Sequence, residues 1–252
     1  MNTKHLRLKI SNESSIHMII KEPIGEKKDC IVFSHGFSVS GFESRRMFWD
    51  ISNDLNKLGY LTVLFDYRGS GYSDLSFSDM TIDTEIQDLN NVIEYVYNNI
   101  NDKKSFILWG QSFGSGVASF VTPKRPEIKA LILWCLSAEL YDRYSVTLGA
   151  EITDKGYVYI ESGFKVNKSF LDSLKNMDVY DAIKQINVPL LLIHGTADKK
   201  ASVTLSHKAF DIANDPKELF VIEGGNHGFK CQPELFETAV RKTFNWIQSL
   251  EV

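Results

Sequence analysis

The sequence of 252 residues predicts an α/β protein built on one mostly parallel β-sheet with helices on both faces. Short runs rich in Val, Ile and Leu recur along the chain, and segments with apolar residues at helical spacing separate them. Continuous apolar strands are typical of parallel sheets, because helices cover both faces of such a sheet. Polar segments that contain glycine follow most of these runs. Right-handed crossovers would bring those segments together at one edge of the sheet.

Eight strands are predicted. The first two, HLRLKI and SIHMIIKE, lie on either side of the turn SNES and predict an antiparallel hairpin. The other six, in chain order, are CIVFSH (30–35), YLTVLFD (60–66), SFILWG (105–110), KALILWC (129–135), VPLLLIHG (188–195) and ELFVIEG (218–224). Apolar spacing predicts helices over 43–58, 81–99, 112–121, about 202–213 and 232–250.

One long segment, residues 137–185, interrupts this alternation of strands and helices. It contains no strong apolar strand but is rich in tyrosine and phenylalanine. A connection of this length is unusual in a compact domain, and its aromatic content argues against disorder. We therefore expect residues 137–185 to form a cap inserted over the site. Residues 1–136 and 186–252 would form the core.

Composition excludes several classes of function. The formal net charge of −4 gives no basic footprint for nucleic acid or anionic lipid. The three cysteines, Cys30, Cys135 and Cys231, are far apart and form no CxxC pair, so buried reduced thiols are expected and no metal or cofactor is predicted. No signal peptide and no run of about 18 apolar residues is present, which favours a cytoplasmic protein without a membrane span.

The stretch GQSFG places Ser112 between Gly110 and Gly114, where a predicted strand turns into a predicted helix. Small residues there could serve only to let the helix pack closely on the sheet. Alternatively, a serine on a sharp strand–turn–helix is held out as a nucleophile. The second interpretation requires a base and an acid from other loops at the same edge, because an alcohol is a weak nucleophile until a base removes its proton.

His227 and Asp198 are the predicted base and acid. His227 lies in GGNHGF, directly after the last strand, where glycines leave the loop free to place the imidazole. Asp198 lies in HGTADKK, after the preceding strand, within reach of the next loop. The chain order is therefore nucleophile, acid, base.

Two backbone amides are predicted to stabilise the oxyanion that forms when a serine attacks a carbonyl. One is the amide of Phe113, at the start of the helix, where the helix dipole also helps. The other is the amide of Phe37, where Gly36 lets the chain turn tightly. Further residues are predicted to line the substrate pocket, namely His35, Gln111, Tyr141, Tyr144, Tyr157 and Tyr159.

Together these motifs resemble those of the α/β-hydrolase superfamily over nearly the whole chain. Within this superfamily, the sequence looks most similar to bacterial cinnamoyl or feruloyl esterases and related carboxylesterases. The resemblance rests on the motifs SHGFSVSGFESRR, DYRGSGYSD, GQSFG, HGTAD and GGNHGF. It implies the triad Ser112, Asp198 and His227, with oxyanion amides at Phe37 and Phe113. It also implies that the inserted cap shapes the substrate pocket.

The sequence thus predicts a serine hydrolase for carboxylic esters of small to medium size, such as aryl, hydroxycinnamoyl or short-chain acyl esters. A thioesterase, an acyltransferase or a serine peptidase would use the same triad, and a binding protein could keep the same fold without catalysis. The expected partner is a small-molecule ester, not nucleic acid. A homodimer is compatible with the sequence, although no residue requires one.

Overall fold

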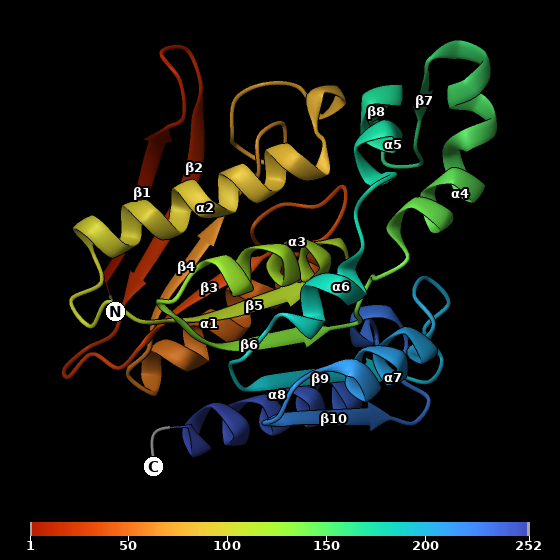
Figure 1. The fold of residues 1–252 in the computed structure, drawn as a ribbon. Helices are drawn as coiled ribbons and strands as arrows, with labels where there is room; N and C mark the ends of the chain where they lie inside the picture. Colours follow the sequence, from red (N-terminus) through yellow and green to blue (C-terminus); the bar gives the residue numbers. More distant parts are fainter. Residues whose placement is uncertain (1, 251–252) are drawn as a thin grey trace.

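The computed structural model describes residues 2–250, and its centre is an eight-stranded mixed sheet (Figure 1). The strand order is β1-β2-β4-β3-β5-β6-β9-β10, in which β1 and β2 run antiparallel to their neighbours and the others are parallel. The strands are β1 (Asn2–Lys9), β2 (Ser15–Glu22), β3 (Cys30–Ser34), β4 (Leu61–Phe65), β5 (Phe106–Gln111), β6 (Ile128–Trp134), β9 (Leu190–Gly195) and β10 (Lys217–Ile222). The predicted strands, hairpin and parallel sheet are confirmed.

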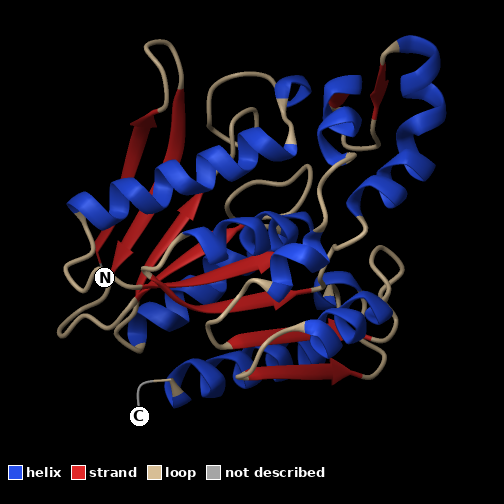
Figure 2. Ribbon diagram, viewed as in Figure 1, coloured by secondary structure: helices blue, strands red, loops and turns tan. Residues whose placement is uncertain are grey.

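Helices cover both faces of the sheet (Figure 2). Helices α1 (Met47–Lys57) and α8 (Pro233–Ser249) pack on one face. The other face carries α2 (Ile82–Asn99), α3 (Phe113–Val121), α6 (Val179–Lys184) and α7 (Val203–Ile212). This three-layer arrangement leaves the loops after the parallel strands together at one edge.

Alternation along the buried strands builds two hydrophobic cores, one on each face of the sheet. In β5, Phe106 and Leu108 join the core under α2 and α3, whereas Ile107 and Trp109 join the core under α1 and α8. Successive side chains of a strand point to opposite faces, so a strand buried on both sides needs apolar residues throughout. The continuous apolar runs in the sequence therefore have a direct structural cause.

The segment between β6 and β9 folds into a small layer of its own. It contains α4 (Leu140–Lys155), the antiparallel pair β7 (Tyr157–Tyr159) and β8 (Lys165–Asn167), and α5 (Lys168–Leu174). Figure 1 shows these elements beyond the carboxyl ends of β5 and β6, whereas α6 lies against α3. The short β7–β8 pair was not expected from the sequence, because three-residue strands carry too little apolar pattern to be recognised.

The first helix begins later than its apolar pattern suggests. Residues Ser44–Arg46 form a single 3₁₀ turn, and α1 starts at Met47. Glu43, Arg45 and Arg46 all have positive φ angles, which an α-helix does not allow.

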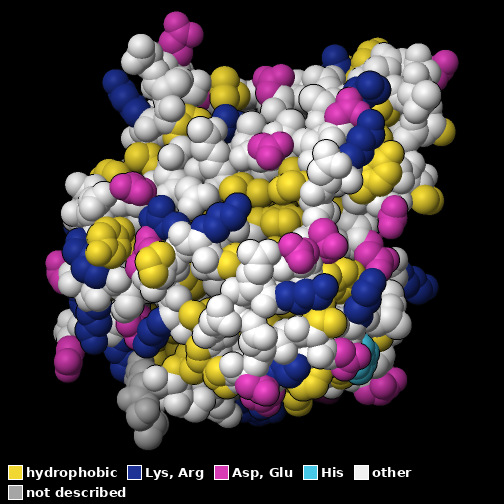
Figure 3. Space-filling view, in the orientation of Figure 1, with side chains coloured by type: hydrophobic (Ala, Val, Ile, Leu, Met, Phe, Trp, Pro, Cys, Tyr) yellow, Lys and Arg dark blue, Asp and Glu magenta, His cyan; other side chains and the backbone are white. Residues whose placement is uncertain are grey.

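The surface carries both signs of charge. Figure 3 shows Lys and Arg side chains interspersed with Asp and Glu over one face, with hydrophobic side chains between them. Within residues 2–250, no helix is both long enough and apolar enough to cross a bilayer.

Candidate active site

Ser112 lies on a strained turn between β5 and α3. Its φ of 54° and ψ of −123° are unfavourable for a residue with a side chain. Gly110 and Gly114, two residues before and after Ser112, let neighbouring backbone segments pack closely against the turn. A Cβ at Gly114 would lie 2.3 Å from the carbonyl oxygens of Ser34 and His35, and one at Gly110 would lie 2.6 Å from the oxygen of Gly114. This tight turn is the elbow that the sequence predicts around a nucleophile.

Three loops bring Ser112, His227 and Asp198 into one hydrogen-bonded chain. The Ser112 Oγ lies 2.9 Å from His227 Nε2, and His227 Nδ1 lies 2.7 Å from Asp198 Oδ2. A carboxylate can only accept, so Nδ1 carries the proton and Nε2 is free to accept from the serine hydroxyl. This is the geometry in which an imidazole can remove the proton from a serine.

The Asp198 carboxylate is buried and fully hydrogen-bonded. Its Oδ1 accepts from the amides of Lys200 and Ala201, at 2.8 and 2.9 Å, while Oδ2 faces His227. Burial alone would raise the pKa of Asp198, but hydrogen bonds from His194 and His227 and the amide of Ala201 hold that pKa well below its ordinary range. Asp198 is therefore a fixed negative charge behind the imidazole.

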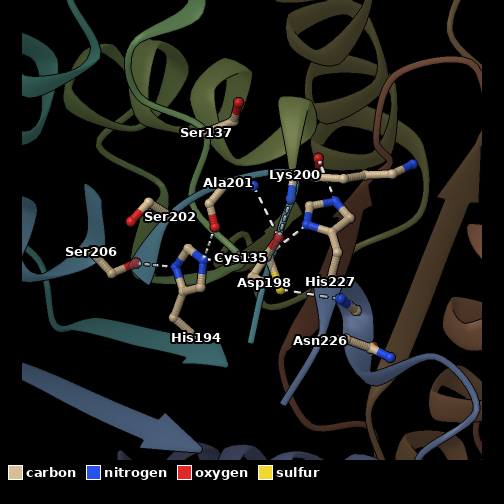
Figure 4. Close-up of polar contacts among 12 residues, drawn as sticks. Cys135, Ser137, His194, Asp198, Lys200, Ala201, Ser202, Ser206, Asn226 and His227 are labelled. Atoms are coloured by element: carbon tan, nitrogen blue, oxygen red, sulfur yellow. Dashed lines mark hydrogen bonds and ion pairs between the residues drawn. The ribbon is translucent and has the colours of Figure 1, made fainter. Parts of the chain in front are cut away.

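A second histidine supports Asp198 from the opposite side (Figure 4). His194 Nε2 lies 3.3 Å from Asp198 Oδ2 and 2.9 Å from the carbonyl of Ala201. Because that carbonyl can only accept, Nε2 carries the proton, and Nδ1 accepts from the Ser206 hydroxyl at 2.6 Å. The sequence showed only that His194 ends a strand. Its partner Ser206 lies in α7, too far along the chain for sequence spacing to connect the two.

Burial lowers the pKa of His227 below its ordinary value of 6.5, and the cations Lys230 and Arg143 lower it further, although Asp198 opposes them. Since the base must be neutral, we expect kcat/KM for an ester to be constant above the ordinary histidine range. It should then fall in a single acid limb with its midpoint below 6.5. A pH profile of kcat/KM measures this ionisation in the free enzyme. A midpoint clearly above 6.5 would contradict the environment described here.

Near Ser112, the backbone amides of Phe37 and Phe113 have no acceptor among the described residues. The amide of Gly36, by contrast, donates to the Glu43 carboxylate at 2.7 Å. Phe113 opens α3, whose first amides have no acceptor within the helix. These are the two amides that the sequence predicts for an oxyanion.

Comparison with known proteins agrees with this topology. Residues 29–144 match the family described as alpha/beta hydrolase fold. The ferulic acid complex of Est1E from Butyrivibrio proteoclasticus superposes with a TM-score of 0.84, at 21% identity, over 95% of this chain and 97% of that one. The chain has the α/β-hydrolase fold. Mouse alpha/beta hydrolase domain-containing protein 10 is similar in the same way, with a TM-score of 0.79, 20% identity and coverage of 98% and 99%.

Curated proteins similar to this chain are considerably longer than it is. YfhR of Escherichia coli K12 is 28% identical over 181 residues, which are 71% of this chain and 57% of that protein. The lysophosphatidylserine lipase ABHD12 of Danio rerio is 28% identical over 173 residues, or 66% and 42% of the two chains. The chain thus spans less than two thirds of the length of these relatives.

Two of the residues predicted to line the pocket, His35 and Gln111, are almost completely buried. His35 is only 1% exposed; its Nδ1 donates to the Gly36 carbonyl, and its Nε2 accepts from the Tyr67 amide. Gln111, also 1% exposed, packs beside Gly228. His35 joins two loops and Gln111 is the last residue of a buried strand, which accounts for their burial.

The four predicted tyrosines have different surroundings. Tyr144 of α4 is buried, and its ring contacts the rings of Phe37 and Phe113. Tyr141, on the same helix, is half-buried. Tyr157 and Tyr159 contact each other on β7, and Tyr159 is 64% exposed. The structure therefore brings Tyr144 to the site and leaves Tyr159 facing solvent.

Cys135 completes the surroundings of Asp198 and was missed as a site residue. Its Sγ accepts from the Gly228 amide at 3.3 Å. With Asp198 and His227 it forms a group of possible metal ligands within residues 2–250, their ligand atoms within 4.8 Å of one another. Burial and the Asp198 charge raise the pKa of the Cys135 thiol, which disfavours the thiolate that a metal would need. The donor set therefore fits a metal poorly.

Proposed function

We propose that the protein is a serine hydrolase that cleaves carboxylic esters of small to medium size through an acyl-enzyme on Ser112. The observation that carries this proposal is the hydrogen-bonded chain from Ser112 through His227 to Asp198, next to two amides without acceptors. A serine, a neutral imidazole and a buried carboxylate in this order are the components of acyl transfer by a nucleophilic serine.

In the proposed reaction, Ser112 Oγ attacks the ester carbonyl while His227 Nε2 takes the serine proton. The carbonyl oxygen becomes an oxyanion that accepts from the amides of Phe37 and Phe113. His227 then gives its proton to the departing alcohol, which leaves the acyl group on Ser112. A water molecule, deprotonated by the same imidazole, releases the acid and restores the serine. Asp198 keeps the His227 tautomer correct and stabilises the imidazolium.

The two residues that carry the proposed oxyanion amides belong to an aromatic cluster. Four aromatic rings, those of Phe37, Phe113, Tyr144 and Phe170, are all in mutual contact, with centroids 5.0–5.9 Å apart. Phe37 and Phe113 carry the two oxyanion amides, and Tyr144 and Phe170 come from the inserted layer. We therefore propose that this layer, within residues 137–185, acts as a cap that limits the acyl group.

Hydrolysis of p-nitrophenyl esters from acetate to a long acyl chain tests the proposed function, with a methyl hydroxycinnamate and a thioester beside them. We expect turnover of the short esters, with rates that fall as the acyl chain grows. The ferulic acid bound to Est1E makes the hydroxycinnamate a suitable aryl probe. If folded protein hydrolyses no ester on this panel, the esterase proposal fails. Turnover of the thioester alone would indicate that the protein is a thioesterase.

A further inference from the structure

The loop that follows β3 has an unusual backbone. Ser38, Glu43, Arg45 and Arg46 all have φ angles between 56° and 63°, although none is glycine. Side chains disfavour this left-handed region, so such residues persist only where their surroundings hold them, and they gather at functional sites. The loop lies between Gly36 and α1, and it carries Phe37, one of the two amides proposed for the oxyanion.

Glu43 holds this loop in shape with its carboxylate. The residue is only 8% exposed. Its Oε2 accepts from the amide of Gly36 at 2.7 Å, and its Oε1 accepts from the amide of Ser44 at 2.8 Å. One buried side chain therefore ties the first turn of the loop to its last turn, across seven residues.

Glu43 and Ser112 both lie next to Gly36. A Cβ built on Gly36 would be 3.1 Å from Glu43 Oε2 and 3.4 Å from the Ser112 Cβ, so both side chains flank this one glycine. The bond to Glu43 occupies the Gly36 amide. The next amide, that of Phe37, is left without an acceptor. Glu43 thus holds the peptide before Gly36, while His35 Nδ1, which donates to the Gly36 carbonyl at 2.9 Å, holds the peptide that carries the Phe37 amide. With both peptides that flank Gly36 held, the direction of the Phe37 amide is fixed.

Cations balance the buried negative charge. Lys230, which follows His227 in the last loop, donates from Nζ to Ser44 Oγ at 2.7 Å. Burial lowers the pKa of Lys230, whereas the Glu43 charge raises it, and Arg45 lies near enough to lower it again. A carboxylate beside a developing oxyanion would oppose catalysis if it acted through its charge alone. Its hydrogen bond to the Gly36 amide is therefore the feature that can favour the reaction.

We propose that Glu43 is a positioning residue of the oxyanion hole: by holding the Gly36 amide, it directs the Phe37 amide at the oxyanion. This inference rests on the proposed serine hydrolase function. Glu43 does not touch the substrate, so its loss should affect the transition state more than the binding of the ester.

Steady-state kinetics of Glu43→Ala and Glu43→Gln on p-nitrophenyl acetate test this role, with Glu237→Ala on the exposed side of α8 as the matched control. Glu43→Ala is expected to lower kcat by about 100-fold while KM changes less than about threefold, because removal of one oxyanion donor costs about that much. Glu43→Gln keeps an oxygen that can accept from Gly36 and should recover most of the rate. The control should match the wild type.

A second measurement separates positioning from a general effect on folding. A boronic acid that forms a tetrahedral adduct with Ser112 should bind Glu43→Ala about 100-fold more weakly, in parallel with kcat/KM. The carboxylate product should bind nearly as well as to wild type. If Glu43→Ala does not fold, Glu43→Asp replaces it, since its shorter side chain cannot reach the Gly36 amide.

The failures of the two proposals can be told apart. A wild-type protein without any ester turnover overturns the proposed function itself. An active wild type whose Glu43→Ala variant, or Glu43→Asp in its place, keeps its kcat and its boronic acid affinity overturns only the role of Glu43. A variant whose KM rises while its kcat stays unchanged would also contradict the positioning role.

Discussion

Replacing Ser112 with alanine is expected to lower kcat for p-nitrophenyl acetate by about 10⁴- to 10⁶-fold, because the acyl-enzyme can no longer form. The substitution removes one hydroxyl from a turn whose backbone is held by Gly110 and Gly114, so the fold should persist. Initial rates and a thermal unfolding curve measure the two effects separately.

Ser119→Ala is the matched control for this change. Ser119 is also a buried serine and lies within α3, but its hydroxyl donates to the Ser115 carbonyl and takes no part in the triad. It should keep nearly full activity. Ester turnover by Ser112→Ala within tenfold of wild type would show that another group is the nucleophile.

Replacing Asp198 with asparagine is the second large effect, and it should lower kcat by about 10⁴-fold. The amide oxygen can still accept from Lys200 and Ala201, so the loop should stay in place. The amide nitrogen would then face His227 Nδ1 and favour the tautomer with its proton on Nε2. That proton would point at Ser112, and the imidazole could no longer accept from the serine.

Kinetics of Asp198→Asn over a range of pH test this explanation. Asp211→Asn on the exposed surface of α7 is the matched control and should behave as wild type. If Asp198→Asn keeps more than about a tenth of the wild-type kcat, then Asp198 does not orient His227. In that case the short distance between them has no catalytic role.

Topology explains why the sequence could predict that Ser112, Asp198 and His227 meet. Ser112, Asp198 and His227 each follow a predicted parallel strand, and such strands end at the same edge of a sheet. Continuous apolar runs such as CIVFS mark strands that are buried on both faces, so the core was predictable too. No knowledge of side-chain direction was needed for either result.

Side-chain direction explains what the sequence could not predict. His35 and His194 both precede glycine at a strand end, yet each is buried and satisfies loop groups instead of substrate. Glu43 looked like an ordinary residue at the start of a helix. Its proposed role depends on a positive φ angle, which no local pattern indicates. Tyr144 lies in YDRYS and Tyr159 in YVYIE, and neither stretch indicates burial; the packing of the inserted layer buries one and exposes the other.

Covalent labelling of Ser112 by a fluorophosphonate tests the central claim most directly. Intact mass spectrometry of the folded protein, followed by peptide mapping, would count the adducts and locate them. We predict one adduct per chain, on Ser112, with none on Ser112→Ala and full labelling of Ser119→Ala. Folded wild-type protein that remains unlabelled at Ser112, or that carries the adduct on another residue, would contradict the account of Ser112 as an activated nucleophile.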